Sequence, residues 1–148
     1  MNVGEEKKIG NFRIECGAVE KFNNAVSYPR TSTMLLNTKT DSEGSNIQLP
    51  TFIMTLGWGE FLDTYSTLFP ISGGVHGGSE FEYYHPVKIG DVISVKVKYL
   101  NIEHREGKKA GNMHIDKFEM FYNNLSSELV GKSIFTLIRF SAEKSSIE

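Results

Sequence analysis

The chemistry-bearing residues of this chain gather in one stretch, VHGGSEFEYYHPVKIGD, which spans residues 75–91. It holds His76 and His85, two of the four histidines. A histidine oriented by a carboxylate is a common general acid–base pair, and two glutamates, Glu80 and Glu82, follow His76 closely. Both lie too near in sequence to promise the contact that would orient the ring. We therefore interpret His76 as a strand-end residue with a structural hydrogen bond, assign no catalytic residue, and retain His76 as a candidate.

The remaining histidines and acids of the C-terminal half have simpler structural interpretations. His85 precedes Pro86 and is expected in a turn, as is Asp91 after Gly90. His114 and Asp116 are two residues apart, so they would share one face of a strand and could form a dyad. Because they flank a predicted hairpin that also holds His104, we expect them at the surface. No three or four potential ligands converge, so we predict no metal site and no cofactor.

Composition narrows the classes of partner. The 148 residues carry 16 Lys and Arg against 18 Asp and Glu, with no clustered basic stretch of the kind that binds nucleic acid. The one cysteine, Cys16, allows no intramolecular disulfide. No apolar run approaches the roughly 20 residues of a membrane span, and no signal peptide is visible. We expect a cytoplasmic protein that binds neither nucleic acid nor membranes.

Two helices are predicted in the N-terminal half. Val19, Phe22 and Val26 have helical spacing within residues 19–28, whereas residues 30–49 are polar and irregular. Residues 49–69, LPTFIMTLGWGEFLDTYSTLF, are apolar almost all round, as in a buried helix. Gly57 and Gly59 are unfavourable in its middle. They indicate either a close approach of backbone or ligand, or a break in the helix.

Strands are predicted after Pro70. Residues 79–84 and 92–100 alternate apolar and polar side chains, residues 113–122 shift their apolar phase as at a bulge, and residues 129–140 are apolar on both faces. The glycine pairs at 73–74 and 77–78 are either bulges or places where a ligand passes close to the backbone. One buried helix followed by antiparallel strands predicts a single α+β domain over residues 1–148, in which the sheet wraps the helix as in the hot-dog fold.

Several segments together resemble one known family. LPTFIMTLGWGE, the stretch from VHGGSEFEYYHPVKIGD through MHIDKFEMFYNN, and the closing GKSIFTLIRF are similar to the N-terminal MaoC-like dehydratase domain. That family includes the non-catalytic-type subunits of heterodimeric (3R)-hydroxyacyl-ACP dehydratases. The resemblance implies a hot-dog domain that binds an acyl-CoA or acyl-ACP thioester. By family position, the residues expected to line or shape the acyl channel are Thr51, Phe52, Gly57, Trp58, His76 and Gly77.

The catalytic residues of that family have no counterpart here. Catalytic MaoC-like domains carry an Asp…Asn-Pro…His segment before the central helix, but residues 28–50 contain Asp41 and no histidine. The resemblance therefore implies a component of an (R)-specific enoyl-thioester hydratase or 3-hydroxyacyl dehydratase, in a homodimer or in a heterodimer whose partner supplies the Asp/His dyad. One alternative is a self-sufficient hydratase, or an acyl-CoA thioesterase using Glu60 or Asp63. A second is a non-catalytic acyl-binding module.

Overall fold

A computed structural model describes residues 1–26, 50–68, 74–107 and 111–140 of the chain. In chain order its elements are β1 (Glu6–Arg13), α1 (Cys16–Ala25), the 3₁₀ helix η1 (Pro50–Thr55), α2 (Trp58–Leu68), β2 (Gly74–Tyr83), β3 (Val92–Gly107), β4 (Gly111–Asn123) and β5 (Leu129–Phe140). The predicted loop at residues 30–49 lies outside the described residues. No described helix is long and apolar enough to cross a membrane.

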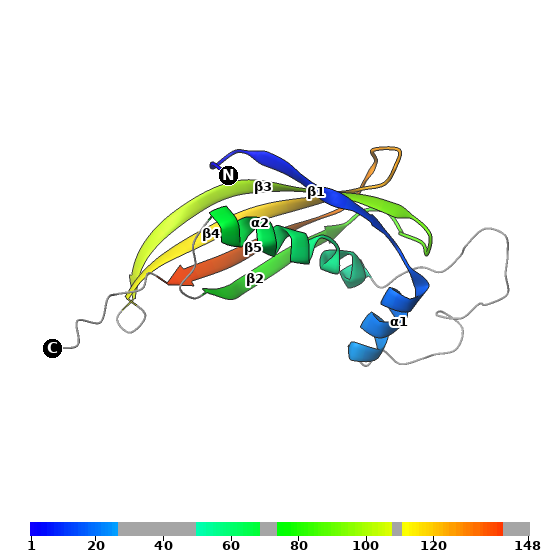
Figure 1. Ribbon diagram of the computed structural model, residues 1–148, viewed down its shortest axis with the longest axis horizontal. Helices are drawn as coiled ribbons and strands as arrows, with labels where there is room; N and C mark the ends of the chain where they lie inside the picture. Colours follow the sequence, from blue (N-terminus) through cyan, green and yellow to red (C-terminus); the bar gives the residue numbers. More distant parts are fainter. Residues whose placement is uncertain (27–49, 69–73, 108–110, 141–148) are drawn as a thin grey trace.

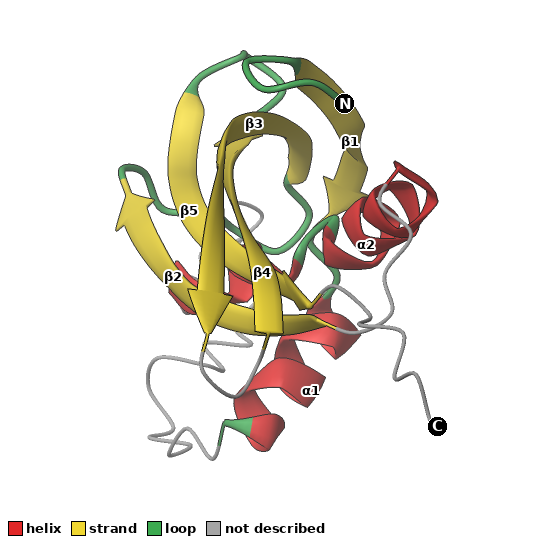
Figure 2. Cartoon of the chain, turned by 90° about the vertical axis from the view of Figure 1, so that its left-hand side faces the viewer, coloured by secondary structure: helices red, strands yellow, loops and turns green. Residues whose placement is uncertain are grey.

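The strands form one antiparallel sheet in the order β1-β3-β4-β5-β2. Figure 1 shows this sheet as an arch with α2 along its concave side and α1 beyond one end, and Figure 2 shows the curvature of the sheet from the side. The inward face of the sheet and α2 supply most of the buried core, which is rich in aromatic rings. The predicted α+β class and hot-dog arrangement are confirmed.

Alternating sequence explains the long strands. Ile93, Val95, Val97 and Tyr99 of β3 point inward and are all buried, while Lys96 between them is exposed. The same period brings alternate residues of β4 and β5 onto the inward face, because successive side chains of a strand point to opposite sides. The strand prediction for residues 92–100 is therefore confirmed.

The predicted buried helix is broken at Gly57. The chain forms η1, turns at Gly57 with φ of +73°, and continues as α2. A Cβ at Gly57 would lie 3.0 Å from the Ile9 side chain, 3.2 Å from Phe12 and 3.3 Å from Val95. Of the two predicted explanations for this glycine, the break is confirmed, and the tight approach is made by side chains of β1 and β3.

Three features differ from the sequence predictions. The strand β1 was not anticipated, because its register shift between Lys8 and Gly10 disrupts the apolar alternation. The helix α1 begins at Cys16, earlier than predicted, and Cys16 is exposed. The bulge predicted in residues 113–122 is wrong: the extra residue is Leu100 of the neighbouring strand β3, and the apolar phase shifts because Asp116 occupies an inward position.

Candidate functional site

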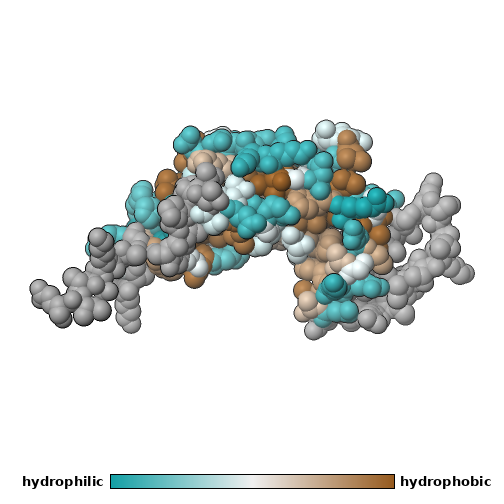
Figure 3. Space-filling model, viewed as in Figure 1, coloured by the Kyte–Doolittle hydropathy of each residue, from teal (hydrophilic) through white to brown (hydrophobic). Residues whose placement is uncertain are grey.

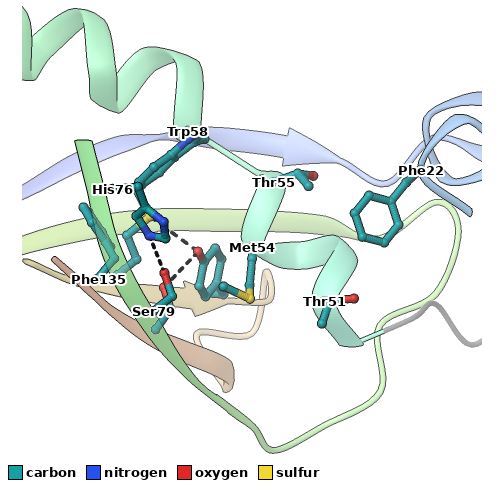
Figure 4. Close-up of a pocket in the computed structure, with 11 residues that line it drawn as sticks. Phe22, Thr51, Met54, Thr55, Trp58, His76, Ser79 and Phe135 are labelled. Carbon is teal, nitrogen blue, oxygen red and sulfur yellow. Dashed lines mark hydrogen bonds between the residues drawn. The ribbon is translucent and has the colours of Figure 1, made fainter. Parts of the chain in front are cut away.

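A cavity of about 510 Å³ opens between the η1–α2 segment and the inward face of β2, β4 and β5. This volume is within the range of about 300–1,000 Å³ typical of small-molecule sites. Figure 4 shows Phe22 and Thr51 at one end and Trp58, His76 and Phe135 at the other. The described lining residues are Phe22, Thr51, Met54, Thr55, Trp58, His76, Ser79, Met120, Tyr122, Ser133 and Phe135.

The polar groups of the cavity are the hydroxyls of threonine, serine and tyrosine and the imidazole of His76, with no carboxylate, Lys or Arg among the described lining residues. His76 Nε2 lies 2.9 Å from Ser79 Oγ. The Tyr122 hydroxyl lies 3.3 Å from Ser133 Oγ and donates to Met120 Sδ at 3.4 Å. Burial raises the pKa of Tyr122 to about 12, so its hydroxyl stays protonated at neutral pH. The cavity therefore suits an uncharged, largely apolar ligand.

A bulge in β2 brings His76 and Ser79 together. Residues three apart in a regular strand point to opposite faces, but the register of β2 against β5 shifts between His76 and Gly78. His76 consequently pairs with Leu137 and Ser79 pairs with Phe135, both of which are buried on the inward face. The predicted bulge at residues 77–78 is confirmed, and its effect is to aim both side chains into the cavity.

The structure places the six predicted binding residues in four different environments. Thr51, Trp58 and His76 line the cavity. Phe52 is buried in the core, with its ring 5.6 Å from the ring of Phe22. The remaining two, Gly57 and Gly77, are not among the described residues that line this cavity. Gly57 packs against β1 and β3. A Cβ at Gly77 would meet Thr136 and Ile138 on the outer face of β5.

Asp116 lies in a buried polar cluster, so its predicted surface position is wrong: it is 0% exposed. Tyr65 donates to Oδ2 at 2.8 Å and Tyr99 to Oδ1 at 2.5 Å, while Arg139 donates from Nε to Oδ2 at 2.5 Å and from Nη2 to Oδ1 at 3.0 Å. Burial alone would raise the pKa of Asp116, but these hydrogen bonds outweigh it and lower the pKa. The same burial and bonds raise the pKa of both tyrosines.

The histidines outside the cavity belong to surface turns and strand pairs. His114 is partly buried opposite His104 in the β3–β4 pair, with 4.4 Å between ring centroids. Burial, Arg139 and His104 lower the pKa of His114. His85 is exposed, with Nε2 3.4 Å from a Glu128 carboxylate oxygen.

The acidic candidates also have a simple structural account where they are described. Asp91 accepts the backbone N–H of Lys88 at 2.8 Å, which confirms the predicted turn. Glu60 and Asp63 are exposed on α2 and are not among the described residues that line the cavity. Asp41 lies outside the described residues. No group of three or more potential metal ligands occurs in the part of the chain that the structure describes.

Sequence reasoning missed most of the cavity lining. Ser79, Tyr122 and Ser133 occupy inward strand positions opposite Phe135, Val95 and Phe81 of the neighbouring strands. Tyr122 carried a local signal, because it continues the alternation of Phe118 and Met120. Phe22 was predicted in a helix, but a helical pattern does not show that α1 packs against the end of η1 and so brings Phe22 to the cavity. Figure 3 shows hydrophobic residues gathered on this face near α1 and η1, beneath a mostly hydrophilic upper rim.

Comparisons with solved structures show the same fold over nearly the whole chain. The HadBC (3R)-hydroxyacyl-ACP dehydratase complex of Mycobacterium tuberculosis is similar at 19% identity, with a TM-score of 0.74, over 92% of this chain and 96% of that one. The R-hydratase PhaJ1 of Pseudomonas aeruginosa gives 17% identity, a TM-score of 0.64, and coverage of 95% and 83%. The ChsH1–ChsH2 complex of M. tuberculosis gives 11% identity and a TM-score of 0.66, over 96% of this chain and 86% of that one. No match was found among curated protein sequences.

The sequence itself carries the family assignment, independently of these distant structural likenesses. A family described as "FAS1-like, dehydratase domain region" matches residues 2–132. This match spans β1 to the first part of β5, and of the described residues that line the cavity only Ser133 and Phe135 lie beyond it. The chain therefore belongs to the FAS1-like dehydratase domain family.

Proposed function

We propose that the chain is the acyl-binding component of an (R)-specific enoyl-thioester hydratase or 3-hydroxyacyl dehydratase. In this reaction the hydroxyl of water adds to C3 of a trans-2-enoyl thioester and a proton adds to C2. The cavity beside η1 and α2 would hold the acyl chain of an acyl-CoA or acyl-ACP. A second MaoC-like subunit would supply the Asp and His that activate the water and deliver the proton.

The observation that carries this proposal is a ligand-sized apolar cavity without an acid–base pair. His76 lines it, but its Nε2 contact is the Ser79 hydroxyl, and no carboxylate is among the described lining residues. Asp116 is held by two tyrosines and Arg139, so it is not positioned to orient His76. Ser79, Tyr122 and Ser133 are suited to binding and orientation, which is what a substrate-holding subunit requires.

The edge strand β2 favours a partner beside the cavity. It pairs only with β5 among the described strands, and residues 74–80 are exposed. Unpaired strand edges are ready templates for pairing with another chain, and His76 lies on this strand. HadBC and ChsH1–ChsH2, which share the fold, are complexes of two different chains. These observations support a homodimer or a heterodimer, with the partner placed near His76.

The self-sufficient alternatives have less support from the geometry. A thioesterase built on Glu60 or Asp63 needs a carboxylate directed at the thioester, yet both residues are exposed on α2 and outside the described cavity lining. A hydratase using His76 needs a carboxylate partner for that ring. A non-catalytic acyl-binding module would have the same cavity, so a functional assay must separate it from the dehydratase component.

The deciding experiment measures hydration of crotonyl-CoA from the loss of enoyl absorbance. The purified chain is assayed alone, as the His76→Ala variant, and after mixing with a catalytic MaoC-like subunit. We expect no turnover above background from the chain alone, and turnover by the mixture that exceeds that of the catalytic subunit alone. If the turnover stops rising once the added chain reaches a fixed molar ratio to the catalytic subunit, the two form a stoichiometric complex.

Each other outcome points to a different function. Turnover by the chain alone that is lost in His76→Ala would contradict the proposal and identify a complete enzyme. Turnover that survives this substitution would direct attention to Asp41. Binding of acyl-CoA without turnover in the mixture, using a longer enoyl-CoA as well as crotonyl-CoA, would favour the acyl-binding module.

A further inference from the structure

We propose that Trp58 divides the acyl-binding channel into two compartments and thereby limits the length of the acyl chain that this protein accepts. This inference rests on the proposed function, because it concerns the same cavity and the same class of ligand. A second cavity of about 340 Å³ lies on the other side of Trp58 and His76, the two described residues that line both. The second cavity is lined by Trp58, Leu62, Tyr65, Gly74, Val75, His76, Leu137, Ile138 and Arg139.

Trp58 is held between the two cavities from three sides. Its ring centroid lies 4.8 Å from that of Phe135 on β5 and 6.2 Å from that of His76 on β2, both edge to face. It also stacks on Phe61 at 5.6 Å. Figure 4 shows the indole beside His76 at the end of the larger cavity opposite Thr51. The position follows from Gly57, where the chain turns between η1 and α2 so that Trp58 begins the helix.

The chemistry of the smaller cavity suits a hydrocarbon tail. Leu62 and Val75 are among the few large apolar residues of the described part of the chain that are strongly exposed, at 40% and 51%, and both line this cavity. Exposed apolar side chains that gather at a groove mark binding sites. Arg139, the one Lys, Arg, Asp or Glu among the described residues that line this cavity, makes a bidentate pair with buried Asp116, which offsets its charge. This compartment therefore favours methylene groups over an anion.

The larger cavity, in contrast, carries the hydroxyl groups that can contact the polar part of a thioester: those of Thr51, Thr55, Ser79, Tyr122 and Ser133. We infer that the thioester-proximal part of the ligand occupies this compartment and that its tail points toward Trp58. A short acyl chain ends before the indole. A long chain must pass it to reach the smaller cavity, and the packed ring prevents this in the native protein.

The test compares binding of octanoyl-CoA and hexadecanoyl-CoA to the full chain by titration calorimetry. In Trp58→Ala, we expect the affinity for hexadecanoyl-CoA relative to octanoyl-CoA to rise about tenfold or more, which corresponds to the burial of about two further methylene groups. Adding Leu62→Trp to this variant refills the smaller cavity and should cancel the gain. Leu125→Ala, at a site that is 75% exposed, is the control for loss of apolar surface and should leave the ratio unchanged.

Two further measurements keep the test decisive. Trp58→Leu repeats the comparison with a smaller loss of packing, and thermal unfolding confirms that each variant is folded. Because Trp58 is the single tryptophan of the chain, its emission in the native protein should change when octanoyl-CoA binds.

The outcomes separate this inference from the proposed function. An unchanged ratio in both folded Trp58 variants overturns the inference while leaving the hydratase proposal intact. If Trp58→Ala raises the affinity for hexadecanoyl-CoA relative to octanoyl-CoA and Leu62→Trp does not cancel the rise, the inference is also overturned, since the end of the acyl chain would then lie outside the smaller cavity. A raised and cancelled ratio without turnover in the hydration assay supports the inference and overturns the proposed chemistry. If the native protein binds the octanoyl group neither as the CoA thioester nor as the ACP thioester, both the inference and the proposed function are overturned.

Discussion

Two groups of polar residues face the interior of this sheet, and they differ in how completely they are satisfied. Around Asp116, a buried carboxylate receives hydrogen bonds from two tyrosines and an arginine. At the wall of the open cavity, His76 contacts the Ser79 hydroxyl, and Tyr122 makes only longer contacts to Ser133 and Met120. A buried charge is tolerated only where its partners are complete, so the first region has a structural role. The second leaves polar groups available to a ligand.

The two regions should differ most in how much the free energy of unfolding falls when a charged or hydrogen-bonding partner is removed. Arg139→Ala leaves the Asp116 carboxylate buried without its charged partner, and we expect the free energy of unfolding to fall by about 3–5 kcal/mol. Urea denaturation followed by circular dichroism measures it. Arg105→Ala is the matched control, because Arg105 pairs with Glu103 at an exposed position and should contribute about 0–1 kcal/mol. Equal effects of the two variants would contradict a structural role for the buried pair.

A single type of substitution compares the regions directly. Tyr99→Phe removes a hydrogen bond to a charged group and should lower the free energy of unfolding by about 1.5–3 kcal/mol. Tyr122→Phe removes long contacts to Ser133 and Met120 beside the cavity and should cost about 0.5–1 kcal/mol. The same denaturation experiment measures both variants. A larger effect for Tyr122→Phe would reverse our assignment of the structural and ligand-binding regions.

Acid should destabilise the protein through the Asp116 cluster. The folded-state pKa of Asp116 is lowered below the unfolded value of about 3.9. Its contribution is therefore fully present above about pH 5 and is lost as pH falls through about 4 toward the folded pKa, at about 1.4 kcal/mol for each unit of difference. Free energies of unfolding measured at pH 6 and at pH 3 test this. Asp116→Asn should show a smaller loss between these conditions, and an identical loss would exclude Asp116 as the source.

Local pattern was sufficient for much of the fold. The alternation at residues 92–100 predicted β3, because the period of a strand depends only on the neighbouring residues. Gly57 signalled the helix break through its cost in a helix interior. The strand β1 was missed because a register shift hides its alternation.

The candidate site was less predictable. Thr51, Trp58 and His76 were assigned to a binding channel through the family resemblance, and the structure places these three around one cavity. The resemblance could not distinguish them from Phe52 in the core, or from Gly57 and Gly77, which face β1 and β3 or the outer surface. Side-chain direction at a glycine turn or a bulge depends on the pairing of distant strands, which no local pattern contains.

The amino-acid sequence alone was enough to predict an α+β hot-dog domain, since short-range periodicity and glycine placement determine which segments form strands and helices. It was also enough to show that residues 28–50 contain no histidine. Only the tertiary structure decided that Asp116 is buried and paired, that a bulge aims His76 and Ser79 inward, and that Trp58 stands between two cavities. These properties arise from contacts between residues far apart in the chain, because strand register sets which side chains meet.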